Sequence, residues 1–365
     1  MSVFDNTVAL SELVNDYLEN EILSVKGISN EIYNPCDLKE QSLKRIFLRK
    51  YRKYATTESV RDFVRERLTN IIDNNLPMTF VPSFGGYKHW WAPTYPSTDW
   101  AEVFNVKFLL EYLAPIYNSY NNVSIEYESE EVILAELNNI PQSGLDQYTK
   151  TFREVLSCFQ NIIGDRTKLS LVLAREQYEE VGFSKELLLK RIEEMMDDYT
   201  KRFDSYEPDD QARRIAKVKT NFKLDGEKKY IGLTDEQIYE IYKNSRVLNE
   251  AFLDADYEVR GESFFDAPST IPLLFSFGLG PGGEAWPHIG SSSSSMVDFW
   301  AGIGILELRT DDDGDSVRIV PRIISQSQYK LLESDLVRIP VKTKLSEFKN
   351  TNYDYIYIYK GTLSF

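Results

Sequence analysis

Short apolar runs alternate with longer stretches of helical periodicity in the first half of this 365-residue chain. The apolar runs are Thr79–Pro82, Val123–Tyr127 and Leu169–Leu173. The stretches between them, Ala101–Tyr120 and Leu145–Ile163, repeat apolar residues at helical spacing. Strands that are each followed by a helix are typical of a parallel sheet with crossover helices. The sequence therefore predicts an α/β fold with a Rossmann-like parallel-sheet core.

Other patterns precede and follow this region. Residues 7–75 keep helical spacing and predict a helical N-terminal region that ends before Pro77. Two later stretches, 184–205 and 234–253, are also predicted to be helical. The last part of the chain is predicted to be rich in β-structure, with strands at 271–277, 303–308, 317–324 and 353–359.

The charge balance limits the partners that this chain can bind. The net charge is −15, and phosphate backbones require a basic surface, so a nucleic-acid partner is not expected. The basic residues at 44–67 are more simply explained as a solvated helix face than as a nucleic-acid site. Cys36 and Cys158 lie far apart without a partner motif, so neither a disulfide framework nor a metal site is expected.

Targeting signals are missing from the sequence. No window approaches the roughly 18 apolar residues that a membrane helix needs. The first residues lack the basic start and apolar run of a secretory signal. We therefore expect a cytoplasmic protein without a membrane partner.

The most informative segment follows the first predicted strand and runs from Phe84 to Trp91. Two adjacent glycines, Gly85 and Gly86, allow the backbone to approach a ligand closely. Lys88 supplies a cation for a phosphate or carboxylate, or an amine for carbonyl chemistry. Its aromatic and imidazole neighbours are candidate substrate-binding residues: Phe84, Tyr87, His89 and Trp90. Because ligands bind at the carboxyl ends of parallel strands, this segment predicts part of an active site; the alternative is a tight turn anchored by buried aromatic residues.

A pair of carboxylates opens the helix that follows. Asp99 and Glu102 lie one helical turn apart and are candidates for acid–base catalysis. The same spacing describes a helix N-cap with a glutamate at the third position, which explains the pair equally well. His288, next to Trp286, is a second candidate acid or base.

Two other motifs are weak. Gly278–Gly283 does not keep the spacing of a dinucleotide-binding loop and lacks the lysine of a phosphate-binding loop. Asp311–Asp315 lacks the closing glutamate of a calcium loop and is more simply a hairpin turn. No metal or other cofactor is expected.

The order of several motifs resembles that of the isonitrile (isocyanide) synthases, a family that includes proteins of pyoverdine and paerucumarin gene clusters. The resemblance covers roughly residues 79–324. It is carried by Phe84–Lys88, Pro96–Glu102, Ile116–Tyr117, Ile271–Phe277, Trp300–Gly302 and Asp313–Gly314. Two departures stand out: Ala301 replaces a family histidine, and Glu128–Glu131 replaces a Ser-Asp-Gly turn.

The resemblance implies an enzyme that condenses the amine of tyrosine or tryptophan with ribulose 5-phosphate, without a cofactor. Lys88 would then bind the phosphate or form the imine, and Asp99, Glu102 or His288 would move protons. Trp286 and Trp300 would help to shape the substrate pocket. The expected organisation is a helical N-terminal region, residues 1–77, and an α/β catalytic domain, residues 78–365, with a helical segment at 184–253.

Two alternatives remain open. The chain is either a diverged transferase or lyase that modifies an amino acid by another reaction, or a non-catalytic binding or scaffold protein. The replacement of histidine by Ala301 favours the first alternative. In the second, the aromatic loop would be a protein contact.

Overall fold

Two compact units make up the chain. Unit 1 comprises Met1–Glu130, Ile140–Val172 and Pro268–Phe365, and unit 2 comprises Glu131–Asn139 and Leu173–Ala267. The computed structural model describes residues 7–51, 57–84, 97–129, 131–132, 135, 141–225, 232–260, 267–275, 288–289, 302–310 and 317–363. The predicted division into residues 1–77 and 78–365 stays a prediction.

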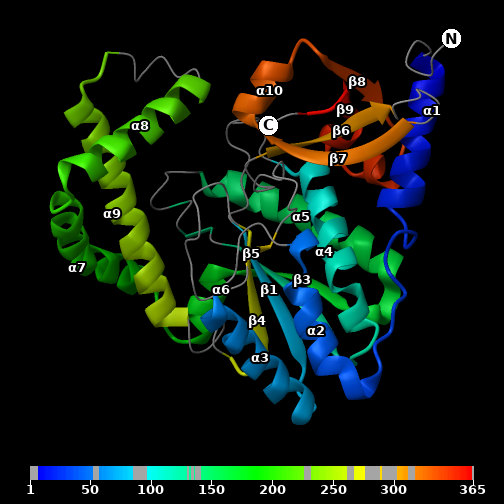
Figure 1. The fold of residues 1–365 in the computed structure, drawn as a ribbon, viewed down its shortest axis with the longest axis horizontal. Helices are drawn as coiled ribbons and strands as arrows, with labels where there is room; N and C mark the ends of the chain where they lie inside the picture. The colour runs from blue at the N-terminus through cyan, green and yellow to red at the C-terminus, as the bar shows by residue number, and fades with distance from the viewer. Residues whose placement is uncertain are drawn as a thin grey trace. The chain divides into compact units, whose positions relative to one another are not determined.

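A five-stranded sheet lies at the centre of unit 1. Its strands are β1 (Met78–Phe84), β2 (Val123–Ser129), β3 (Lys168–Leu173), β4 (Thr270–Phe275) and β5 (His288–Ile289), in the order β3-β2-β1-β4-β5. β1 pairs in parallel with β2 and β4, which lie on either side of it, and β4 pairs in parallel with β5. Figure 1 shows β1 and β4 side by side in the sheet. The predicted α/β fold with a parallel-sheet core is confirmed.

Two long helices connect the first three strands. α4 (Trp100–Tyr117) follows β1, and α5 (Gln142–Ile163) follows β2. α4 is buried along almost its whole length because it packs against α2, α5, β6 and β7. Its buried polar side chains have partners, as burial requires: for example, Asn105 accepts a hydrogen bond of 3.1 Å from the hydroxyl of Tyr127.

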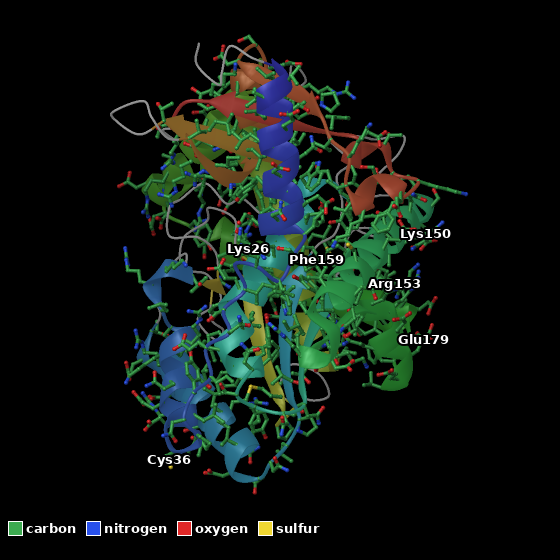
Figure 2. All side chains as sticks on the ribbon, turned by 90° about the vertical axis from the view of Figure 1, so that its right-hand side faces the viewer. Lys26, Cys36, Lys150, Arg153, Phe159 and Glu179 are labelled. Atoms are coloured by element: carbon green, nitrogen blue, oxygen red, sulfur yellow. The ribbon has the colours of Figure 1, made fainter. Side chains whose placement is uncertain are left out.

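The N-terminal helices also belong to unit 1. They are α1 (Thr7–Tyr17), the π-helical turn η2 (Leu18–Ile22), the short turn η3 (Pro35–Asp37), α2 (Leu38–Ile46), the turn η4 (Arg49–Tyr51) and α3 (Glu58–Asp73). α2 packs against both α3 and α4. The predicted helical N-terminal region is therefore confirmed for the described residues. Figure 2 shows Lys26 in the segment after η2, and Lys150 and Arg153 on α5.

A second sheet forms the β-rich C-terminal part of unit 1. Its strands are β6 (Gly302–Thr310), β7 (Val317–Ser325), β8 (Leu336–Pro340) and β9 (Tyr355–Lys360), in the order β7-β6-β9-β8. β6 and β9 run parallel, whereas the other two pairs are antiparallel. The connections contain α10 (Gln326–Leu332) and the turns η10 (Lys344–Glu347) and η11 (Thr351–Tyr353). The predicted strands at 303–308, 317–324 and 353–359 correspond to β6, β7 and β9, and β8 was not predicted.

Unit 2 is helical. It contains α6 (Ala174–Glu180), α7 (Lys185–Asp204), α8 (Pro208–Asp225) and α9 (Asp235–Arg260). α7 and α9 pack against each other and confirm the two predicted helical stretches. Arg260 is fully buried, and its guanidinium donates to both carboxylate oxygens of Asp256 at 2.6 Å and to the side-chain oxygen of Gln177 at 2.5 Å. A buried charge needs such a complete set of partners.

Candidate functional site at the carboxyl edge of the parallel sheet

The parallel sheet extends to both sides of the central strand β1. The connection through α4 leads to β2 on one side, whereas β4 pairs with β1 on the other side after a long stretch of sequence. The boundary between β1 and β4 is therefore a topological switch point. In open α/β sheets, ligands bind at the carboxyl ends of the strands beside such a point.

The predicted aromatic loop starts at this edge. β1 ends at Phe84, which lies opposite Ser129, and the preceding Ser83 lies opposite Leu274 of β4. In turn, Leu274 lies opposite His288 of β5. The backbone of two predicted site residues, Phe84 and His288, therefore lies at or near the carboxyl edge.

Eight predicted site residues lie outside the described residues, and their roles stay predictions. They are Gly85, Gly86, Tyr87, Lys88, His89, Trp90, Trp286 and Trp300. Six of them belong to the segment that joins the end of β1 to Ser97, and Trp286 belongs to the segment that joins β4 to β5. Both segments therefore continue from strands beside the switch point.

Asp99 and Glu102 form the predicted capping box at the start of α4. The Asp99 carboxylate accepts a hydrogen bond of 2.6 Å from the backbone N–H of Ala101, and Oε2 of Glu102 accepts one of 2.8 Å from the backbone N–H of Asp99. Oε1 of Glu102 accepts a further hydrogen bond, of 2.7 Å, from the hydroxyl of Tyr148 on α5. Glu102 is fully buried, so it links the capping box to the neighbouring helix.

The segment before α4 is held by residues near the C-terminal end of the chain. The side-chain amide of Asn350 donates to the backbone oxygen of Thr98 at 2.8 Å, and that of Asn352 donates to the Ser97 hydroxyl at 2.9 Å. The Tyr353 hydroxyl donates to the Thr98 side-chain oxygen at 2.6 Å. Because these bonds are buried or partly buried, they fix the entry to the helix with little freedom.

Two buried tyrosines in this network stay protonated. Burial raises the pKa of Tyr148 well above its ordinary value, and the nearby Glu102 carboxylate raises it further. The pKa of Tyr353 is raised well above its ordinary value, also mainly by burial. Both hydroxyls are therefore hydrogen-bond donors across the physiological pH range, which matches their oxygen partners.

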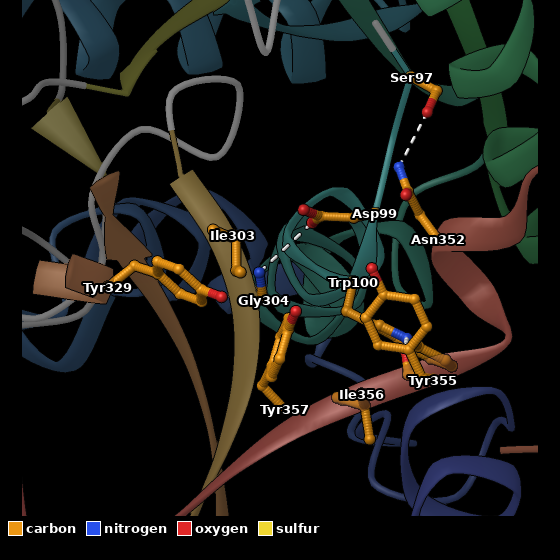
Figure 3. A pocket seen from close by; sticks show the side chains of 10 residues that line it. All are labelled: Ser97, Asp99, Trp100, Ile303, Gly304, Tyr329, Asn352, Tyr355, Ile356 and Tyr357. Atoms are coloured by element: carbon orange, nitrogen blue, oxygen red, sulfur yellow. Dashed lines mark hydrogen bonds between the residues drawn. The ribbon is translucent and has the colours of Figure 1, made fainter. Parts of the chain in front are cut away.

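A cavity of about 320 Å³ lies beside the start of α4. Figure 3 shows its side chains, with the carboxylate of Asp99 near the middle and the rings of Tyr329, Tyr355 and Tyr357 around it. The floor is formed where β6 meets the helix: the backbone N–H of Gly304 donates to Asp99 Oδ1 at 3.3 Å. A carboxylate next to aromatic rings is suited to a cationic amine, because both ring faces and carboxylates attract positive charge.

Gly304 permits this close approach because it has no side chain. A Cβ atom built on Gly304 would lie 2.4 Å from the carbonyl carbon of Trp100 and 2.5 Å from the backbone nitrogen of Ala101. Trp100 is itself fixed, because its indole N–H donates to the backbone oxygen of Tyr355 at 2.9 Å. The cavity is therefore built from backbone contacts among α4, β6 and β9.

Sequence reasoning missed Glu128. This carboxylate is fully buried at the end of β2, directly opposite Ser83 of β1. A buried charged group at the carboxyl edge of a parallel sheet is a candidate for binding or proton transfer. The sequence gives little signal for this burial, because Glu128 continues the polar positions Ser124 and Glu126 of the alternating strand and was interpreted only as a departure from the family turn.

The fold defines an α/β protein whose parallel sheet has a topological switch point beside β1, and whose helix α4 forms a candidate small-molecule cavity with the C-terminal sheet. The chain is similar in structure to the PvcA protein from Pseudomonas aeruginosa, known from a crystal structure. The TM-score is 0.57 at 17% sequence identity, and the match covers 88% of this chain and 99% of that chain. This similarity establishes a shared fold. No family model matches the chain, and no curated protein matches its sequence.

The part of the chain that the structure describes lacks two kinds of feature. Within it, no helix is both long enough and apolar enough to cross a membrane. The described residues also contain no group of three or more histidine, cysteine, aspartate or glutamate side chains arranged to hold a metal ion.

We expect Glu102→Ala to lower the free energy of unfolding by roughly 2–6 kcal/mol. The change removes the hydrogen bonds that Glu102 accepts from the buried Tyr148 hydroxyl and from the Asp99 backbone N–H, at about 1–3 kcal/mol each. Tyr148→Phe, which removes only the hydroxyl, should cost less. Urea denaturation followed by circular dichroism measures both. Equal stability of Glu102→Ala and the unchanged protein would contradict the described capping box.

Proposed function

We propose that this protein is a biosynthetic enzyme of the isonitrile synthase type that acts on an aromatic amino acid and a sugar phosphate such as ribulose 5-phosphate. The main support is the fold shared with the PvcA protein over 88% of the chain. The order of the sequence motifs, which resembles that of the isonitrile synthases, agrees with this proposal. The family motif Phe84–Lys88 begins at the end of β1, beside the switch point.

The cavity beside α4 is the proposed site for the amine of the amino acid. Its volume of about 320 Å³ is at the lower end of the range of about 300–1,000 Å³ typical of small-molecule pockets. Asp99 would hold the ammonium group and accept its proton, because condensation with a carbonyl requires the neutral amine. The rings of Tyr355 and Tyr357 would pack against the aromatic side chain.

The phosphate of the second substrate would bind Lys88, in the segment between β1 and Asp99. The backbone amides at the first turn of α4 do not compete for this role, because the capping box already satisfies those of Asp99 and Ala101. His288 and Glu128 are the proposed groups for later proton transfers, since both lie on strands near the carboxyl edge.

The test is a direct assay of the reaction. The purified protein is incubated with tyrosine or tryptophan and uniformly ¹³C-labelled ribulose 5-phosphate, and inorganic phosphate and product masses are measured. The proposal predicts phosphate release and a product that has gained one labelled carbon and lost two hydrogens. Absence of both with either amino acid would reject the isonitrile reaction.

Variants connect the reaction to the proposed site. Asp99→Asn retains a good helix cap but loses the charge, so its kcat/KM is expected to fall by roughly 10²-fold or more while the fold persists. Lys88→Ala is expected to raise KM for the sugar phosphate. Lys150→Ala, on the exposed face of α5, is the matched control and is expected to keep full activity.

A diverged transferase or lyase that modifies an amino acid by another reaction is the second candidate. It is favoured by Ala301, by the replacement of the family turn with Glu128–Glu131, and by the burial of Glu128. In this case the protein would bind tyrosine or tryptophan at the Asp99 cavity without releasing phosphate from ribulose 5-phosphate. Calorimetric titration with each amino acid, together with the phosphate assay, distinguishes the two functions.

A further inference from the structure

A second cavity, of about 390 Å³, lies between the middle of α4 and β7 in unit 1. α1, η2 and η4 complete its walls. None of its lining residues lines the cavity around Asp99. Its contributions from α4 are Phe104, Lys107, Phe108 and Glu111, which lie on one face of the helix because they are three or four residues apart.

Lys107 is the central charged group of this cavity. Its side chain is only 7% exposed, and its ammonium donates to the backbone oxygens of Ser24 and Lys26, both at 2.9 Å. An ammonium carries three N–H donors, so these two acceptors leave one donor for a ligand. Burial lowers the pKa of Lys107 to about 8 despite the nearby carboxylates of Glu111 and Glu21.

Most other charges around the cavity are already paired. Lys50 forms an ion pair with Glu111 at 3.1 Å, and Glu21 forms one with Lys26. On β7, Arg322 pairs with the buried Glu307 at 2.5 Å. By contrast, none of the described carboxylates forms an ion pair with Lys107.

Among the cations that line this cavity, Arg318, like Lys107, forms no ion pair with a described carboxylate. It lies on β7, is exposed and lines the same cavity. The remaining walls combine four aromatic side chains, Tyr17, Tyr51, Phe104 and Phe108, with aliphatic residues of η2 and β7. Two available cations and four aromatic rings complement a ligand that combines an anionic group with a ring.

We propose that this cavity is a second binding site, which takes a small aromatic carboxylate. A singly charged carboxylate fits better than a phosphate dianion, because Glu21 and Glu111 also line the cavity and repel a second negative charge. The volume of about 390 Å³ is suited to a single-ring compound. The inference does not depend on the reaction proposed above.

Calorimetric titration of the full chain with three matched probes tests the site. 4-Hydroxyphenylacetate is expected to bind. The second probe, p-cresol, has the same ring without the carboxylate. It is expected to bind at least about tenfold more weakly, because it lacks the charge-assisted hydrogen bond. Phenyl phosphate is also expected to bind more weakly than the carboxylate. Equal affinity for p-cresol, or no binding of the carboxylate at millimolar concentration, would overturn the proposal.

Variants assign the binding to this cavity. Lys107→Met keeps most of the side-chain length and should weaken binding of 4-hydroxyphenylacetate by about tenfold or more. Arg318→Gln changes an exposed residue, so it keeps the proposal testable if Lys107→Met fails to fold, and it should weaken binding several-fold. Lys150→Met is the control and should bind as the unchanged protein does. If folded Lys107→Met and Arg318→Gln both bind like the control, the site is elsewhere.

The affinity should also depend on pH. A bound carboxylate favours the charged ammonium of Lys107, so binding should weaken as pH rises above about 8, the pKa of this lysine in the free protein. The pKa of Tyr17 is raised by burial to about 12, so this hydroxyl does not titrate in the same range. The other charged and titratable groups that line the cavity are Tyr17, Glu21, Lys50, Tyr51, Glu111, Arg318 and Arg322, and Lys26 pairs with Glu21. Unchanged affinity between pH 7 and pH 10 would contradict a role for Lys107.

Discussion

Gly304→Ala is expected to destabilise unit 1 by about 3 kcal/mol or more, the upper end for overpacking of a core. The added methyl group would meet the backbone of Trp100 and Ala101 at 2.4–2.5 Å. Backbone atoms at the first turn of a buried helix have no space to move into, so β6 must separate from α4. The cavity around Asp99 would open at the same time, because Gly304 and Trp100 both line it.

Guanidinium denaturation measures this effect, and Gly182→Asn is the control. No atom outside its immediate neighbours lies within 4 Å of the Cβ position at Gly182, and its φ of +69° is one that asparagine tolerates. The control is expected to change stability by less than about 1 kcal/mol. A Gly304→Ala protein as stable as the control would show that β6 does not approach α4 as described.

Arg260→Met is expected to destabilise unit 2 by about 3–5 kcal/mol, the cost of leaving a buried charge without its partner. Asp256 is 4% exposed and also accepts a hydrogen bond from the Tyr178 hydroxyl, which would remain after the loss of Arg260. Replacing both charges, as in Arg260→Met with Asp256→Leu, should restore part of the lost stability, because no uncompensated carboxylate then remains.

A second arginine of unit 2 is the matched control for this effect. Arg191 pairs with Glu258 at 2.8 Å, but both side chains are about half exposed. Such surface pairs contribute about 0–1 kcal/mol, so Arg191→Met should change the unfolding midpoint little. Hydrogen exchange would locate the effect of Arg260→Met in residues 174–260. Equal effects of the two substitutions would contradict the buried network.

Strands and helices were predictable from the sequence wherever the spacing of apolar residues within the segment itself indicates the element. β1, β2 and β3 overlap the predicted apolar runs, because buried parallel strands consist of short apolar segments between helices. β8 has no such pattern: it is short, and Arg338 and Pro340 are exposed. The position of β4 beside β1 could not be predicted, because nothing local in the sequence states which strands pair.

The candidate site, like the strands and helices, was predictable only where it depends on residues close together in the sequence. The spacing of Asp99 and Glu102 indicated a capping box as one of two interpretations, and this motif depends only on residues within one turn. Tyr148 and Tyr353 were not predicted, because they reach the start of α4 from 46 and 255 positions away in the sequence. Contacts of this kind depend on the packing of whole elements and leave no local pattern.

The position of β9 in the C-terminal sheet has a consequence for synthesis of the chain on the ribosome. β9 lies between β6 and β8 and supplies Tyr355 and Tyr357 to the cavity, although it is the last described strand in chain order. In a nascent polypeptide, the first turn of α4 therefore stays exposed until β9 has emerged from the ribosome. A premature stop before residue 355 would leave every loop of the parallel sheet in the product yet remove one wall of the cavity and the acceptor of the Trp100 indole. Truncated products should thus be targets for cellular proteolysis.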